Sequence, residues 1–96
     1  MIVHVVMFKF KEQNKQENLM VVKSRLEELV SKIPTLGSIE VGIDINQSER
    51  AYDLSLYSRF HTKDDLKAYA IHPAHLEVVE LIKNVTQDSK VVDYEQ

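Results

Sequence analysis

The sequence predicts an α+β fold, in which four strands form an antiparallel sheet and two helices cover one of its faces. Two observations predict this fold. Apolar residues alternate in four short segments, as they do in strands, and recur at helical spacing in two longer ones. The segments follow one another in the order β-α-β-β-α-β, and a chain of 96 residues fits a single domain over residues 1–96.

The first strand is expected over residues 2–10. Its alternation gives two largely apolar faces: Ile2, His4, Val6, Phe8 and Phe10 on one, and Val3, Val5, Met7 and Lys9 on the other. A strand with two apolar faces belongs in the interior of a sheet that is covered on both sides.

The first helix is expected to start at Asn14, which can cap it, with Glu17 in the position of a capping-box acid. Pro34 and Gly37 are expected to close it. The apolar residues at helical spacing between these ends are Leu19, Val22, Leu26, Leu29, Val30 and Ile33.

Three further strands are expected. Residues 39–46 alternate cleanly between apolar and polar, which is typical of a strand with one buried face. A polar turn ends at residue 50, a third strand covers residues 51–61, and a short last strand covers residues 90–95.

A second helix is expected to begin at Thr62, with Asp64 and Asp65 in its first turn. Pro73 interrupts it, because a proline there removes a backbone hydrogen bond and clashes with the carbonyl group of Tyr69. A new helical turn can begin at Pro73 itself. Leu76, Val79 and Ile82 then follow at helical spacing.

This element order is typical of the ferredoxin-like split βαβ arrangement, with both helices on one sheet face. The opposite face would leave the second apolar set of the first strand in water, and soluble monomers rarely expose such a surface. The sequence therefore predicts a homodimer, in which two copies pack sheet to sheet about a two-fold axis as an α+β barrel.

Composition excludes several classes of function. The chain has no cysteine, which excludes disulfides and thiolate chemistry. Its net charge is −3 and it has no run of Lys or Arg, so no nucleic-acid partner is expected. The apolar run at residues 2–7 is too short to span a membrane and lacks the flanks of a signal peptide. We therefore expect no membrane association and a cytoplasmic location.

The densest group of chemically useful residues is the segment Tyr69-Ala70-Ile71-His72-Pro73-Ala74-His75. On an uninterrupted helix Tyr69 and His75 would point roughly 120° apart. The break at Pro73 allows His75 to turn toward Tyr69. A phenol and an imidazole that face one cavity can form an acid–base pair, since the imidazole titrates near neutral pH and the phenol can donate to an oxyanion.

The other histidines and one acid each have two interpretations. His72 either hydrogen-bonds at the helix junction or takes part in the pocket, and His4 is either a core histidine with a polar partner or a pocket residue. Asp93 either faces solvent or pairs with a histidine, whose tautomer and basicity it would then set. No metal site is expected, because His72 and His75 lack the spacing and the glutamate of a zinc-protease motif.

Three stretches resemble the stress-responsive dimeric A/B barrel (Dabb) family: residues 4–11, the segment from Tyr69 to His75, and Val92-Asp93-Tyr94. The resemblance implies a ferredoxin-like protomer and a barrel-forming homodimer. One member, the plant enzyme olivetolic acid cyclase, is similar around the same segment. That similarity implies an aldol cyclisation without a cofactor, in which Tyr69 is the acid, His75 the base, Asp93 orients His75, and His4 and His72 lie in or beside the pocket.

The sequence departs from that enzyme early in the third strand. Where the enzyme has a histidine two positions after a tyrosine, Tyr52 is followed by Asp53 and Leu54. The plant substrate is therefore not carried over. Three functions stay open: a cofactor-free cyclase or lyase acting on a carbonyl compound, a non-enzymatic stress-related or ligand-binding protein, and a monooxygenase or isomerase of the wider dimeric α+β barrel group.

Overall fold

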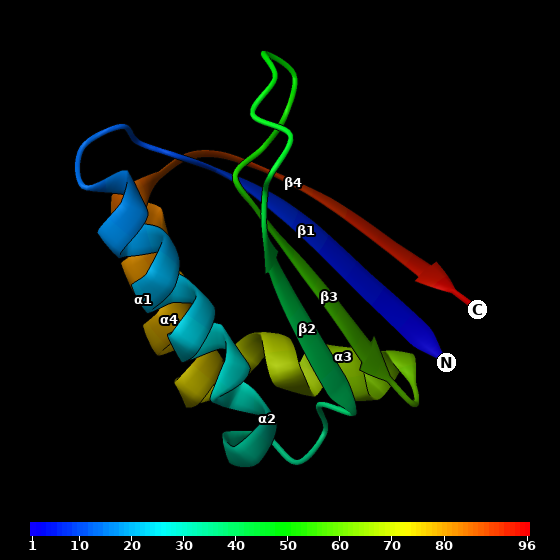
Figure 1. Cartoon of the computed structure of the whole chain (residues 1–96). Coiled ribbons are helices and arrows are strands. Elements are labelled where there is room, and N and C mark those ends of the chain that lie inside the picture. Colours follow the sequence, from blue (N-terminus) through cyan, green and yellow to red (C-terminus); the bar gives the residue numbers. More distant parts are fainter.

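The computed structural model describes residues 1–96 as a twisted four-stranded sheet with its helices on one side (Figure 1). The elements are β1 (Ile2–Phe10), α1 (Lys15–Glu27), α2 (Leu29–Lys32), β2 (Ser38–Ile43), β3 (Leu54–Phe60), α3 (Lys63–Ile71), α4 (Pro73–Val85) and β4 (Thr86–Glu95). The strands lie in the order β2-β3-β1-β4, and every neighbouring pair is antiparallel. The predicted ferredoxin-like fold is confirmed, as is the interior position of the first strand.

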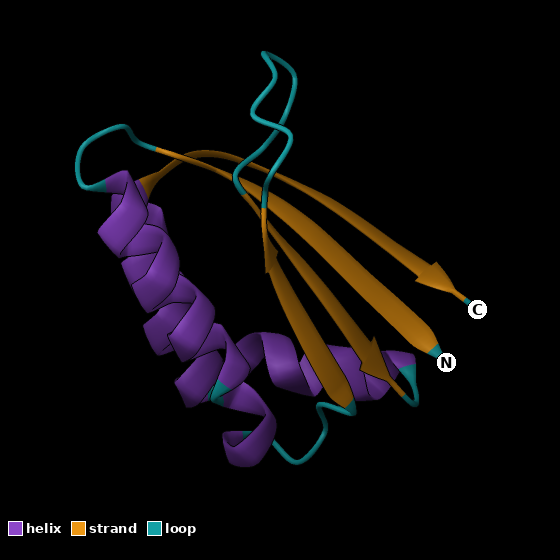
Figure 2. Ribbon diagram, viewed as in Figure 1, coloured by secondary structure: helices purple, strands orange, loops and turns teal.

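The helices form one layer against the sheet. Figure 2 shows α1 and α4 side by side, and α3 lying across the end of the sheet near the close of β3. None of the helices is long and apolar enough to cross a membrane.

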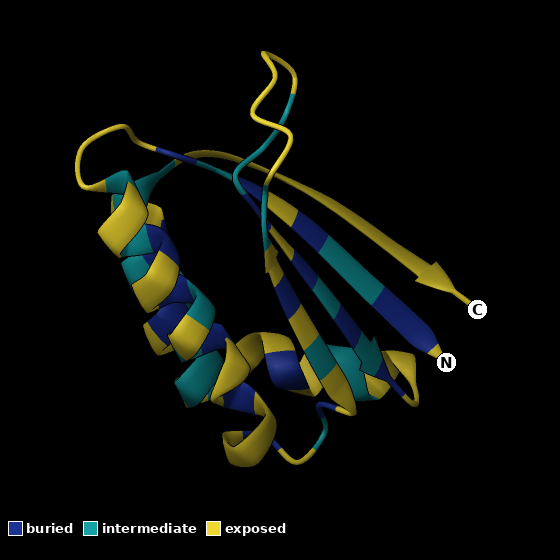
Figure 3. Cartoon of the chain, viewed as in Figure 1, coloured by how far each residue is buried: buried dark blue, intermediate teal, exposed yellow.

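The hydrophobic core lies between this helical layer and the sheet (Figure 3). The first face of β1 contributes Ile2, Val6, Phe8 and Phe10, and α1 contributes Leu19, Val22 and Leu26. Burying a side chain of this size stabilises the fold by about 1.5–3 kcal/mol. The apolar stripe of the first helix therefore determines which of its faces meets the sheet.

The expected capping box at Asn14 is wrong. Asn14 adopts a left-handed backbone conformation with φ of 55°, and its side chain forms no cap hydrogen bond. Asparagine tolerates this conformation better than most residues, so here it serves the tight turn that leads from β1 into α1. The helix is also interrupted at Glu28, and Val30 in the short α2 is exposed.

The buried face of α4 also differs from the expected one. Leu76 is 52% exposed, whereas Val78 and Ile82 are buried. On an α-helix, positions two residues apart lie about 200° apart, so with Val78 turned to the sheet Leu76 points away from it. The spacing predicted the helix correctly but assigned Leu76 to the wrong side.

Three strand boundaries differ as well. β2 ends at Ile43, three residues before the expected end, and Ile45, which lies beyond it, is 94% exposed. β3 begins at Leu54 and not at residue 51, because the Asp53 carboxylate accepts a hydrogen bond from the Phe10 amide at the end of β1 (2.7 Å). β4 begins at Thr86, four residues before the expected start, directly after α4 ends. It pairs with β1 along almost its entire length.

Candidate functional site

The site is built around the junction between α3 and α4. His72 has an extended backbone (ψ 135°) and separates the two helices, and Pro73 is the first residue of α4. The His72 Nδ1 atom accepts a hydrogen bond from the amide of Ala74 (3.1 Å), so this side chain caps α4. The structure thus gives His72 a place at the junction itself.

The junction turns His75 toward Tyr69. The centroids of the two rings lie 4.3 Å apart with an interplanar angle of 43°. Tyr69 also contacts Phe60 of β3 (5.0 Å) and lies edge-on to the His4 ring of β1 (6.3 Å). One cluster therefore contains His4, Tyr69 and His75, with the tyrosine between the two histidines. The break in the helix predicted that Tyr69 and His75 would face each other.

The hydroxyl group of Tyr69 has no hydrogen-bond partner in the chain, although the residue is only 1% exposed. Buried hydroxyl groups nearly always have a partner, and leaving one without costs about 1–3 kcal/mol. Burial raises the pKa of Tyr69 to about 12. The phenol is therefore protonated at neutral pH and has a hydrogen bond left to donate.

His75 is held as a neutral base. Its Nδ1 atom lies 3.0 Å from the carbonyl oxygen of Ala70. If Nδ1 carries the proton and donates it there, Nε2 is left to accept another. Burial lowers the pKa of His75 below its ordinary value; the hydrogen bond to Ala70 opposes this, and the nearby His4 and His72 add to the lowering.

Asp93 does not orient His75, contrary to the expectation from the sequence. Its carboxylate is hydrogen-bonded to Nδ1 of His4. The reason is the register: His4 and Asp93 lie directly opposite each other on the adjacent strands β1 and β4, so their side chains share one face. The expected His–Asp pair exists, with a different histidine.

A cavity of about 210 Å³ lies between α4 and the sheet. Its lining is largely apolar and includes both His4 and His75, whereas Tyr69, His72 and Asp93 are not among the lining residues. The lining residues are His4, Val6, Phe8, Leu26, Leu56, His75, Val78, Val79, Ile82, Lys83, Thr86 and Ser89.

Lys83, Thr86 and Ser89 are polar lining residues that the sequence did not single out. One signal could have found Lys83: it lies eight residues after His75, which places it near the same face of a helix. No such signal exists for Ser89, because its position depends on the length and register of β4.

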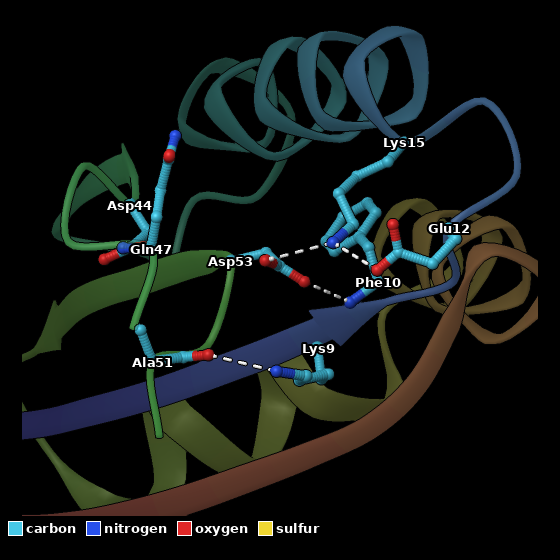
Figure 4. Close-up of polar contacts among 8 residues, drawn as sticks. All are labelled: Lys9, Phe10, Glu12, Lys15, Asp44, Gln47, Ala51 and Asp53. Atoms are coloured by element: carbon cyan, nitrogen blue, oxygen red, sulfur yellow. Dashed lines mark hydrogen bonds and ion pairs between the residues drawn. The ribbon is translucent and has the colours of Figure 1, made fainter. Parts of the chain in front are cut away.

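A second polar cluster anchors the loop between β2 and β3 (Figure 4). Asp53 accepts from the Phe10 amide and lies 3.6 Å from the ammonium group of Lys15, which also binds Glu12 (2.9 Å). Lys9 donates to the carbonyl oxygen of Ala51 (3.2 Å). Each of these groups satisfies a partner within the chain, so this cluster holds the loop on β1.

Comparison with known proteins identifies the family. The model of the stress responsive A/B barrel domain (Dabb) matches residues 2–96. The chain belongs to the Dabb family. Two Arabidopsis thaliana proteins described as stress-response A/B barrel domain-containing proteins agree with this: one, DABB1, is 36% identical over 98 residues, and the other is 30% identical over 92 residues.

The alignments cover 95% of this Dabb chain but only 45% of DABB1 and 35% of the second Arabidopsis protein, so the chain spans less than half the length of either relative. The functions of those longer proteins are therefore not assigned to this chain.

Solved structures show the same fold. A dimeric protein of unknown function and ferredoxin-like fold from Bacteroides fragilis is 33% identical, with a TM-score of 0.83 over 99% of this chain and 95% of that chain. A hydroxynitrile lyase from Passiflora edulis is 21% identical, with a TM-score of 0.86 over 97% of this chain and 90% of that chain. At 21% identity the lyase shares the fold alone.

Proposed function

We propose that this Dabb chain forms a homodimer, each protomer of which acts on a small carbonyl compound as a cofactor-independent lyase or cyclase. The observation that carries the proposal is the buried Tyr69 hydroxyl, which has no partner in the chain and belongs to a ring packed against the neutral imidazole of His75. The base lines a largely apolar cavity, and the ring that carries the hydrogen-bond donor packs against it from behind the lining.

The proposed reaction begins with proton transfer to Nε2 of His75. The proton comes from the carbon next to the carbonyl group, and the electron pair of the broken C–H bond moves onto the carbonyl oxygen. The Tyr69 hydroxyl donates a hydrogen bond to the enolate oxygen that results. In the cyclising direction the enolate carbon attacks a second carbonyl group, a C–C bond forms, and the new alkoxide takes the proton back from His75.

The cleaving direction uses the same groups in reverse. His75 removes the proton of a hydroxyl group, the C–C bond breaks, and the electron pair passes to the carbonyl oxygen of the leaving fragment, where Tyr69 stabilises it. The His4–Asp93 pair adds a second imidazole to the cavity wall, and its carboxylate favours the tautomer with Nδ1 protonated.

The homodimer is supported by the sheet face that the helices leave uncovered. Met7 of β1 and Val92 and Tyr94 of β4 are exposed and lie on that face. Structural neighbours from Bacteroides fragilis, Thermobifida fusca and a Jannaschia species are described as dimeric. Sheet-to-sheet packing would remove these apolar side chains from water.

The test is deuterium exchange into medium-chain methyl ketones in heavy water, followed by NMR. We expect the wild type to deuterate the carbon beside the carbonyl group faster than buffer does. Tyr69→Phe and His75→Gln are each expected to slow the exchange by about 100-fold or more. His61→Gln, at an exposed histidine beyond the end of β3, is the matched control and should exchange like the wild type.

Equal exchange by the wild type and both variants would contradict the proposed roles. Saturable ketone binding without exchange would favour the second candidate, a non-enzymatic stress-related ligand-binding protein. One observation favours that candidate: His72 and His75 both bond to backbone groups at the helix junction, as residues of a structural joint do.

Three statements stay predictions from the sequence. They are the monooxygenase or isomerase alternative, the single-domain organisation and the cytoplasmic location.

A further inference from the structure

The cavity between α4 and the sheet has two polar ends and an apolar middle. The helix lines it with His75, Val78, Val79, Ile82 and Lys83. These positions are separated by three, four, seven and eight residues from the first, so they form one strip along the helix. The strip begins with His75 and ends with Lys83, which is exposed, and three aliphatic residues lie between them.

The opposite wall repeats this order. β1 lines the cavity with His4, Val6 and Phe8, and the register places Asp93 beside His4 and Ser89 beside Phe8. The end at Phe8 is also where α4 finishes, since the Lys11 amide donates to the carbonyl oxygen of Val85 (2.9 Å). Both walls therefore run from a histidine end to an end marked by Lys83, Thr86 and Ser89.

The two walls also agree on the length of the cavity. The eight residues from His75 to Lys83 span about 12 Å at the rise of an α-helix. The four residues from His4 to Phe8 span about 13 Å at the rise of a strand. Since the volume is about 210 Å³, well below that of pockets for drug-sized ligands, the space suits a narrow chain.

Lys83 is the one lysine or arginine among the lining residues, and it forms no ion pair within the chain. Its neighbours in the lining at this end, Thr86 and Ser89, are uncharged and carry hydroxyl groups. Asp88, the nearest acid in sequence on β4, hydrogen-bonds to Tyr52 and lies 3.6 Å from Lys90. The Thr86 hydroxyl donates to the carbonyl oxygen of Ile82 (2.8 Å), which leaves Ser89 as the hydroxyl donor at this end. An exposed lysine without an ion pair, together with a serine hydroxyl at the end of an apolar channel, is suited to a carboxylate.

We propose that the cavity takes a narrow, bifunctional ligand whose carbonyl group lies at the His75 end and whose carboxylate binds Lys83, with an unbranched apolar segment between them. The carbonyl end rests on the proposed function. The carboxylate end rests on the geometry of the cavity alone, and it makes Lys83 a specificity-determining residue.

The experiment measures binding to the full chain by isothermal titration calorimetry, with octanoate and octanol as probes. We expect the wild type to bind octanoate more tightly than octanol. Lys83→Met should weaken octanoate binding by about tenfold and leave octanol binding unchanged. Lys67→Met removes a charge from an exposed lysine on α3 and should change neither affinity. Butanoate, which is too short to fill the channel, should bind more weakly than octanoate.

The proposal is overturned if octanoate does not bind, if Lys83→Met binds it as the wild type does, or if His75→Gln is the variant that weakens it. In the last case the carboxylate would occupy the histidine end. These results do not depend on turnover. If the wild type exchanges deuterium but does not bind octanoate, the proposed roles of Tyr69 and His75 are retained and the Lys83 site is rejected. If the wild type binds octanoate but does not exchange deuterium, the Lys83 site is retained and the proposed reaction is rejected.

Discussion

At the scale of single residues, Tyr69 combines two properties that work against each other. Its ring is packed against Phe60, His4 and His75, which stabilises the fold, while its hydroxyl group lies buried without a partner. A residue selected for packing alone would be served as well by phenylalanine. In the proposed function, this hydroxyl donates its hydrogen bond to the ligand.

We expect Tyr69→Phe to leave the free energy of unfolding unchanged or to raise it by up to about 1 kcal/mol, because it removes an unsatisfied buried group. Tyr69→Ala should lower it by about 3–5 kcal/mol through loss of the ring. Urea unfolding of both variants gives the comparison. A clear loss of stability in Tyr69→Phe would show that the hydroxyl group has a structural partner.

His75 gives the protein a dependence on pH. Burial lowers its pKa in the folded state, while the unfolded chain has the ordinary value of about 6.5. In the interval between the two values the unfolded state binds more protons, so stability falls as the pH decreases through it and levels off below the lower value. The same lowering keeps the imidazole neutral at pH 7, so that it can accept a proton.

We expect the free energy of unfolding to decrease from about pH 7 toward about pH 5 more steeply in the wild type than in His75→Gln. Urea unfolding at a series of pH values measures the difference. An NMR titration should place the midpoint of His75 lower in the folded protein than in the urea-unfolded one. Parallel stability curves for the two proteins would show that His75 is not responsible.

At the scale of elements, the junction of α3 and α4 determines where the site residues point. Pro73 suits the first position of a helix, because its missing N–H group would have no partner there and its φ angle is already helical. His72 supplies the cap that a Ser, Thr, Asp or Asn normally supplies. Their combination ends one helix, begins the next and aims His75 at Tyr69.

We expect His72→Ala to lower the free energy of unfolding by about 1 kcal/mol, the usual cost of losing an N-cap. His72→Asn keeps a side-chain acceptor at the same position and should recover most of that loss. Chemical denaturation of the two variants is the measurement. If both variants are destabilised equally, the His72 ring acts through contacts other than the cap.

At the scale of the whole molecule, one sheet face is covered by helices and the other is not (Figure 3). β4 lies at the sheet edge, and its side chains are exposed on both faces apart from Thr86 at its start. Neighbouring residues of this strand point to opposite faces, so a substitution at each position probes one face without the other. Val91 is 58% exposed and lies opposite Val6 on the helix side, whereas Val92 is 60% exposed and lies opposite Val5 on the bare side.

We expect Val92→Lys to convert a dimer into a monomer, because it would place a charge in an apolar interface. Val91→Lys is the matched control, on the same strand and equally exposed, and should stay dimeric. Size-exclusion chromatography with light scattering gives the masses. A monomeric wild type, or the same mass for both variants, would contradict a sheet-to-sheet dimer.

The sequence by itself determined the fold and the helix break. Alternation and helical spacing report which side of each element is apolar, and Pro73 breaks a helix through its own covalent structure, whatever surrounds it. The cluster of Tyr69 and His75 could be predicted for the same reason, since both residues belong to one short segment.

Only the tertiary structure decided which histidine pairs with Asp93 and which residues line the cavity. Asp93 and His4 are separated by 89 residues in the chain and meet through the register of β1 and β4. A shift of that register by one residue would move the Asp93 side chain to the other face of the sheet. Local sequence carries no information on such a register, and so the partner of Asp93 and the place of Ser89 at the far end of the cavity became visible only in the folded chain.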